Sequence, residues 1–141
     1  MGRMLACLEV QMADKVMVEI SPGELIDKLT ILEIKLDRIA DAAKLANVRR
    51  EYEPLKEKLR QSFPETGELA ALTDELKRIN LTLWDIEDDI RECERQGDFG
   101  DKFVGLARSV YRTNDTRAAV KYSINKLLGS EIIEEKNYAQ Y

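Results

Sequence analysis

The residues of this sequence that are best suited to binding chemistry are the cations of its last third. Residues 102–128 hold six Lys or Arg and one Asp, whereas the whole chain has a formal net charge of -5. We expect a helix to begin at Asn114, where exposed backbone N–H groups would attract an anion such as phosphate. Cationic side chains around that point would complete the site. The candidate anion-binding residues are Arg108, Arg112, Asn114, Arg117 and Lys121.

A second interpretation of the same cations involves the segment before them. Residues 85–101 hold eight acidic residues and two arginines. Charged helices commonly pair with one another, so the arginines could neutralise this acidic stretch without binding any ligand. Both interpretations remain open at the level of sequence.

The acidic stretch is also a candidate metal site. Asp85 lies three or four residues before Asp88 and Asp89, so their carboxylates share one helix face. All-α nucleotide hydrolases hold Mg²⁺ with carboxylates at such spacing, and an earlier helix could supply a second pair from Glu33 and Asp37. The alternative is a solvated acidic face that binds no metal.

Several kinds of catalysis are excluded by missing residue types. The sequence has no histidine, which removes His-based general bases, Ser-His-Asp triads and HExxH zinc sites. Cys7 and Cys93 are too few for a structural zinc site, and no glycine-rich phosphate loop is present. We therefore expect no cofactor, and we consider an enzyme the less favoured interpretation.

Residues 21–39 predict the first helix that would position these groups. Ser21 is the expected N-cap, Pro22 suits the first helical position, and Glu24 would complete a capping box. The apolar residues that follow are spaced three and four apart, as in a heptad seam. Ile31 and Ile34 form a second ridge, which could mediate self-association.

Similar spacing predicts the later helices. Asp41 would cap a second helix, which Pro54 should kink or divide. A third helix over residues 69–96 has the clearest seam, ends at Gly97, and is expected to be the central strut of the fold. A fourth helix would follow, and Asn114 or Asp115 would cap a fifth. The predicted fold is all-α, an antiparallel bundle of four to five long helices after a short extended segment.

Length and composition indicate one domain without a membrane span. We interpret residues 1–15 as a disordered lead-in and residues 16–138 as a single helical-bundle domain. No apolar run approaches the ~20 residues that cross a bilayer. The net negative charge argues against nucleic acid, and the low cysteine content favours a cytoplasmic location.

Four longer strings carry a resemblance to a known family: Ile20 to Glu33, Leu45 to Tyr52, Leu83 to Arg91, and Tyr111 to Ala118. Over roughly Val18 to Tyr138 the chain resembles a bacterial family of short uncharacterised domains. Some members are encoded beside, or fused to, sugar-transferase and repeat proteins. The resemblance implies no catalytic residue, but it suggests a role in surface-polysaccharide systems by analogy.

Two classes of function follow from these observations. The first is a cytoplasmic interaction or accessory module that binds a protein partner or itself through coiled-coil-like ridges. The second is an all-α domain that binds a phosphate-bearing small molecule such as a nucleotide-sugar, or a carboxylate-Mg²⁺ nucleotide hydrolase. The positions of the side chains distinguish these classes.

Overall fold

A computed structural model describes residues 15–141, and over this range the chain is all-helical, with no strand. The four helices are α1 (Pro22–Arg38), α2 (Ala42–Ser62), α3 (Gly67–Gln96) and α4 (Asp101–Leu127). The prediction of an all-α fold is therefore confirmed.

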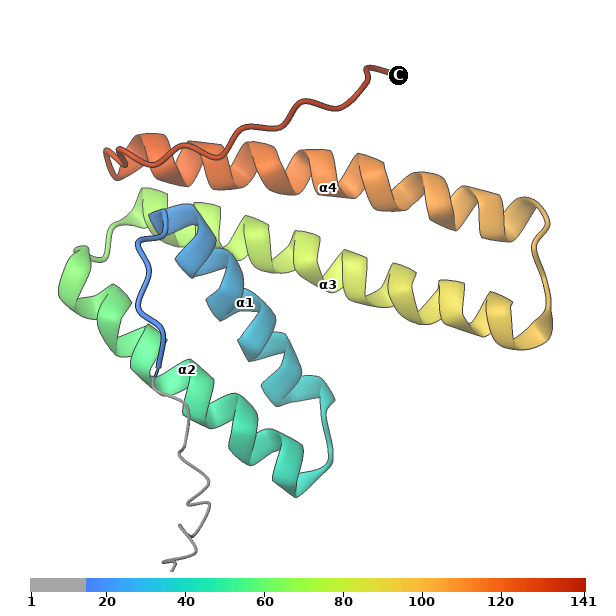
Figure 1. The fold of residues 1–141 in the computed structure, drawn as a ribbon, viewed down its shortest axis with the longest axis horizontal. Helices are drawn as coiled ribbons and strands as arrows, with labels where there is room; N and C mark the ends of the chain where they lie inside the picture. Colours follow the sequence, from blue (N-terminus) through green and yellow to red (C-terminus); the bar gives the residue numbers. More distant parts are fainter. Residues whose placement is uncertain (1–14) are drawn as a thin grey trace, which may run out of the picture.

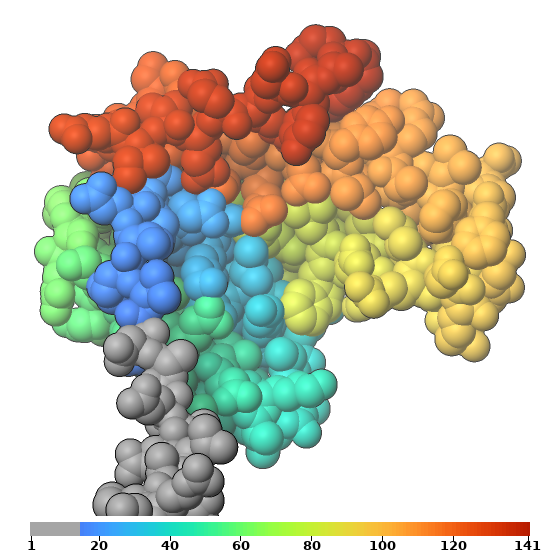
Figure 2. All heavy atoms as spheres, viewed as in Figure 1, coloured from blue at the N-terminus to red at the C-terminus, as the bar shows by residue number. Residues whose placement is uncertain are grey.

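The helices form two hairpins of unequal length (Figure 1). The longer hairpin pairs α3 with α4, and the shorter one pairs α1 with α2. Helix α1 contacts all three other helices. The shorter hairpin lies over only one end of the longer one, whose other end projects as an arm (Figures 1 and 2). We call residues 89–110 the arm.

Local sequence rules account for most helix ends. The Ser21 side chain accepts a hydrogen bond from the Glu24 backbone N–H, and Asp41 caps α2 in the same way. Gly97 ends α3 with a left-handed φ of 68°, which glycine adopts without steric cost. These three predicted boundaries are confirmed.

Two predicted helix breaks do not occur. Helix α2 continues through Pro54 and is not divided there, which leaves a kink as the other predicted effect of this proline. Helix α4 runs unbroken from Asp101 to Leu127, so Asn114 lies in the middle of a helix and caps no fifth one. The physical reason is that the turn around Asn114 packs within the longer hairpin, and tertiary contacts outweigh weak local preferences.

The core lies where α1 crosses the longer hairpin. Its buried cluster contains Ile26 of α1, Leu69 and Leu76 of α3, and Val120 and Ile124 of α4. Helix α1 is the most buried helix, so the expectation that the third helix is the central strut is wrong. Because α1 covers only one end of α3, Ile79 and Leu83 are half-buried rather than fully enclosed.

Residues 15–20 have no regular structure and are exposed. The lead-in predicted for residues 1–15 falls almost entirely outside the described residues. No helix within residues 15–141 has the length and apolar character needed to cross a membrane. After α4 the chain turns at Gly129, and residues 131–141 run back along α4 without regular structure (Figure 1).

Candidate functional site

The first turn of α1 lies directly on α4. The Gly23 backbone N–H donates to the Asn125 side-chain oxygen at 2.7 Å, and Asn125 is buried. A Cβ on residue 23 would lie 2.7 Å from the Lys121 carbonyl oxygen and 2.8 Å from Asn125 Oδ1. Only glycine therefore allows α1 to approach α4 this closely.

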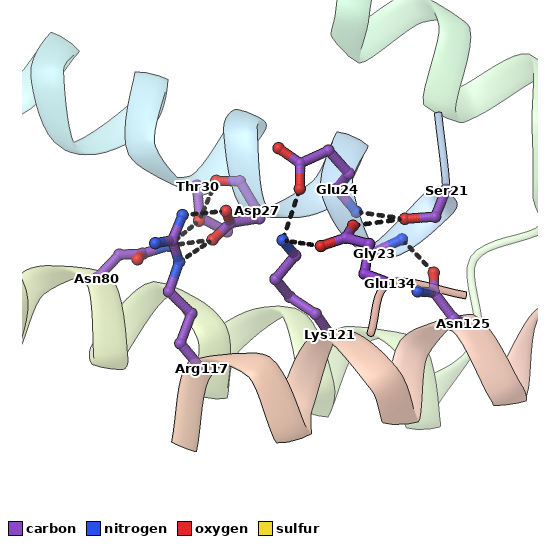
Figure 3. Close-up of polar contacts among 10 residues, drawn as sticks. All are labelled: Ser21, Gly23, Glu24, Asp27, Thr30, Asn80, Arg117, Lys121, Asn125 and Glu134. Carbon is purple, nitrogen blue, oxygen red and sulfur yellow. Dashed lines mark hydrogen bonds and ion pairs between the residues drawn. The ribbon is translucent and has the colours of Figure 1, made fainter. Parts of the chain in front are cut away.

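A buried carboxylate joins α1, α3 and α4 one turn further along (Figure 3). Asp27 is 1% exposed and accepts hydrogen bonds from Asn80 Nδ2 at 2.8 Å and from Arg117 Nε at 2.9 Å. Arg117 also donates from Nη2 to the second carboxylate oxygen, which completes a bidentate ion pair. Asn80 donates in addition to Thr30 Oγ1 at 2.9 Å. The charge of Asp27 is thus fully compensated inside the protein.

A second set of charges connects α1, α4 and the C-terminal segment. Lys121 Nζ lies 2.5 Å from Glu24 Oε2 and 2.8 Å from Glu134 Oε2. Ser21 Oγ donates to the other oxygen of Glu134 at 3.1 Å. The Glu24 carboxylate therefore pairs with Lys121 instead of completing the capping box. We call the ten residues of Figure 3 the polar junction: Ser21, Gly23, Glu24, Asp27, Thr30, Asn80, Arg117, Lys121, Asn125 and Glu134.

The charged groups of the polar junction are held in their ionised forms. Burial opposes the charge on Lys121, but hydrogen bonds with Glu134 and Glu24 outweigh it and raise the pKa of the ammonium group. Burial also opposes the charge on Glu134, yet pairing with Lys121 lowers the pKa of that carboxyl. The hydrogen bond with Asp27 raises the pKa of Arg117. All three groups are consequently charged at neutral pH.

A cleft of about 780 Å³ lies beside the polar junction, between α4 and the C-terminal segment. Asp115 fixes the far end of that segment, because it accepts from Lys136 Nζ at 2.6 Å and from the Tyr141 hydroxyl at 2.7 Å. The Tyr141 ring also packs edge-on against Tyr111, with centroids 5.1 Å apart. Four tyrosines line the cleft together with charges of both signs: Tyr111, Tyr122, Tyr138, Tyr141, Asp115, Arg117, Lys121, Glu134, Glu135 and Lys136.

The structure brings together some of the predicted anion-binding residues. Asn114, Arg117 and Lys121 line this cleft. Arg112 instead lines a separate shallow cavity on the hairpin, and Arg108 is exposed on α4. The site was predicted to include the N-terminal end of a helix that begins at Asn114. That helix end does not exist, because α4 is continuous.

The second interpretation, in which the arginines of residues 102–128 neutralise the acidic stretch of residues 85–101, also differs from the structure. Arg117 pairs with Asp27 of α1 and not with the acidic stretch of α3. Among the ion pairs of residues 15–141, none joins α3 to α4; the acidic stretch pairs within α3 or with Arg38. Arg117 and Lys121 of α4 are thus compensated by α1 and by the C-terminal segment.

The five predicted metal ligands are not brought together. Glu33 pairs with Lys77 and accepts from the Tyr52 hydroxyl, and Asp85 pairs with Arg38. Asp37, Asp88 and Asp89 lie on the surfaces of α1 and α3. Within residues 15–141, no group of three or more Asp, Glu, Cys or His side chains is arranged to hold a metal ion.

Sequence reasoning identified the cations of the site but missed their partners. Asp27 is 90 residues from Arg117, and Glu24 is 97 residues from Lys121, so no local spacing relates them. The available signal was Asp27 itself, a charged residue between the apolar positions of the first helix. The tyrosines of the C-terminal segment carried no such signal.

Comparison with known proteins gives one match. No curated protein and no solved structure was found to match the chain. A family model described as a family of unknown function (DUF6165) matches residues 16–141. The match includes every residue of the polar junction and of the cleft. The chain therefore belongs to this family of unknown function, DUF6165, over residues 16–141.

Proposed function

We propose that this protein is an accessory binding module rather than an enzyme, and that the cleft beside α4 holds the sugar part of its ligand. The observation that carries this proposal is the cleft lining, which combines four tyrosines with fixed charges of both signs. Its volume of about 780 Å³ lies within the range of small-molecule sites.

The ionisation of the site supports binding over catalysis. A general acid or base works best when its pKa lies near the operating pH. Here the pKa of Lys121 and that of Arg117 are raised, and the pKa of Glu134 is lowered. Each shift moves the group away from neutrality, so these side chains retain their charges and serve as permanent hydrogen-bond donors and acceptors.

The charge balance of the lining favours an uncharged polar group over a phosphate. The cleft has three carboxylates, and the same number of Lys and Arg residues. Arg117 and Lys121 are further compensated by Asp27 and Glu24 from outside the cleft. A sugar hydroxyl both donates and accepts hydrogen bonds, so it can use ionised groups of either sign. The C–H face of the sugar ring suits the flat tyrosine rings.

The cellular setting follows from the same proposal. The resemblance to domains associated with sugar-transferases supports a module that works beside enzymes that use nucleotide-sugars. We therefore propose a cytoplasmic accessory role in which the module holds a nucleotide-sugar or a sugar chain for a partner enzyme. A phosphate-bearing ligand remains compatible with this role if its sugar occupies the cleft.

Isothermal titration calorimetry with UDP-glucose, maltose, UDP and inorganic phosphate tests the proposal. We expect heat from the two glucose-containing ligands, UDP-glucose and maltose, and none from phosphate. Tyr122→Ala should weaken binding about tenfold by removing one ring of the cleft. Phe99→Ala is the matched control, because Phe99 is a similarly exposed aromatic residue in the loop between α3 and α4.

The outcomes separate the two ligand classes. If phosphate and UDP bind, and UDP-glucose binds no more tightly than UDP, the anion-site interpretation is restored. Absence of heat from all four ligands, or equal losses in Tyr122→Ala and Phe99→Ala, would contradict the sugar-binding role.

A further inference from the structure

A smaller cavity also has Arg117 in its lining. It has a volume of about 350 Å³ and is formed by α1, α3 and α4. One wall is apolar and consists of Ile31, Ile34, Leu83 and Trp84. Ile34 is only 1% exposed, so the second ridge of α1 is largely enclosed by the chain itself.

One end of this cavity offers hydrogen-bond donors from Arg117. Two of its N–H groups bind Asp27, and the guanidinium carries further N–H groups beyond these. The bidentate pair fixes the plane of the guanidinium, so the remaining donors are held in place before any ligand arrives.

Asn80 offers an acceptor at the same end. The side chain is buried, and both hydrogen bonds from Nδ2 point to α1, at Asp27 and Thr30. No hydrogen bond to Asn80 Oδ1 occurs within residues 15–141. In that part of the chain, every side-chain nitrogen or oxygen that is fully enclosed has a hydrogen-bond partner. Asn80 Oδ1 has no such partner, and it is therefore not fully enclosed. Because Asn80 lines the cavity, this oxygen is open to it.

The residues that carry the donor and the acceptor share one partner. Arg117 Nε and Asn80 Nδ2 bind the same oxygen of Asp27, at 2.9 and 2.8 Å. A ligand that uses both residues must carry an anionic acceptor for Arg117 and a donor for Asn80 Oδ1. Glu87 also lines the cavity but is paired with Arg91, so the carboxylate of Asp88 is the one that favours a positive charge on the donor.

We propose that this cavity, which is separate from the cleft, binds a free amino acid with an apolar side chain. The α-carboxylate accepts from Arg117, the ammonium group donates to Asn80 Oδ1 near Asp88, and the side chain packs against Ile31, Leu83 and Trp84. An α-amino acid meets all three requirements because one carbon atom carries the carboxylate, the ammonium group and the apolar side chain. Its carboxylate thus meets the free N–H groups of Arg117, and its ammonium group lies on the side of Asp88.

Trp84 is the only tryptophan of the chain, so its fluorescence reports on this cavity alone. We expect L-leucine to change the Trp84 emission in a saturable manner. Isovalerate lacks the ammonium group and isoamylamine lacks the carboxylate, so each should bind at least about tenfold more weakly. Calorimetry on the same samples covers the case in which binding leaves the emission unchanged.

Asp88→Asn provides the test by mutation. Asp88 is exposed, so the variant should fold, and we expect half-saturation to require about tenfold more L-leucine. Glu75→Gln is the matched control, because Glu75 is an exposed acid of α3 that lines a different cavity. The proposal is overturned if millimolar L-leucine gives neither heat nor a change in emission. Equal binding of all three compounds, or equal behaviour of both variants, overturns it as well.

Discussion

The polar junction and the arm share helices α3 and α4 but are stabilised in different ways. At the junction, α1 buries eight residues, and one of them is the charged Asp27. In the arm, Cys93 is the one residue of 89–110 that is buried. The junction depends on compensated charges and close backbone approach, whereas the arm depends on a single two-helix seam. Substitutions that look similar in the sequence should therefore have unequal effects.

The largest expected effect is that of Asp27→Ala. Removing this carboxylate leaves Arg117 half-buried without its partner, and breaking such a buried pair typically costs about 3–5 kcal/mol. Urea unfolding followed by circular dichroism measures the change. Asp89→Ala, which removes an exposed acid of the arm, should stay within about 0.5 kcal/mol. Equal losses in the two variants would show that the junction has no special role.

The next largest effect is expected from Gly23→Ala. The new methyl group would overlap the Lys121 carbonyl oxygen, which belongs to the backbone of α4 and cannot move away independently. Overpacking of this kind costs about 1–3 kcal/mol. Unfolding by urea again provides the measurement, and a variant as stable as the wild type would mean that α1 does not approach α4 this closely.

Gly105→Ala should have the opposite sign. A Cβ at this arm position meets nothing within 4 Å, and glycine inside a helix is less stable than alanine by about 0.5–1 kcal/mol. We expect a thermal midpoint that rises by a few degrees. A fall would indicate that another surface packs against Gly105 in solution.

The smallest effect concerns pH. The pKa of Glu134 is lowered from its ordinary 4.5, so its contribution to stability is present above that value and lost as pH falls through the lower, folded-state pKa. The pKa of Lys121 is raised from 10.5, so its contribution is lost only as pH rises through the higher, folded-state pKa. The Glu134 side chain is 45% exposed, so solvent screening keeps the acid effect small. Thermal melts of the wild type and Glu134→Gln should converge at acid pH, and a constant difference would contradict this pairing.

The sequence predicted those parts of the fold that local rules determine. Ser21 and Asp41 cap their helices, and Gly97 ends α3, because each role depends only on the neighbouring few residues. The break at Asn114 was predicted from the same rules and is wrong. Continuity of α4 comes from packing against α3 and α1, which no local pattern encodes.

The candidate site could likewise be predicted from the sequence only in part. The charge imbalance of residues 102–128 singled out Arg117 and Lys121, because charge can be counted along the chain. Their partners Asp27 and Glu24 could not be assigned, since pairing across 90 and 97 residues requires the tertiary fold. The cleft itself depends on where residues 131–141 lie, and that segment has no periodic pattern from which a position could be predicted.

A titration with UDP-glucose, followed by two-dimensional ¹H–¹⁵N NMR, tests most directly whether the cleft binds a sugar. We expect shifts of the backbone amides of α4 between Val110 and Tyr122 and of the C-terminal segment from Glu134 onward. The amides of the arm between Ile90 and Gly105 should remain in place. Shifts confined to the arm or to α2, or no shift at saturating ligand, would contradict the assignment of the cleft as the binding site.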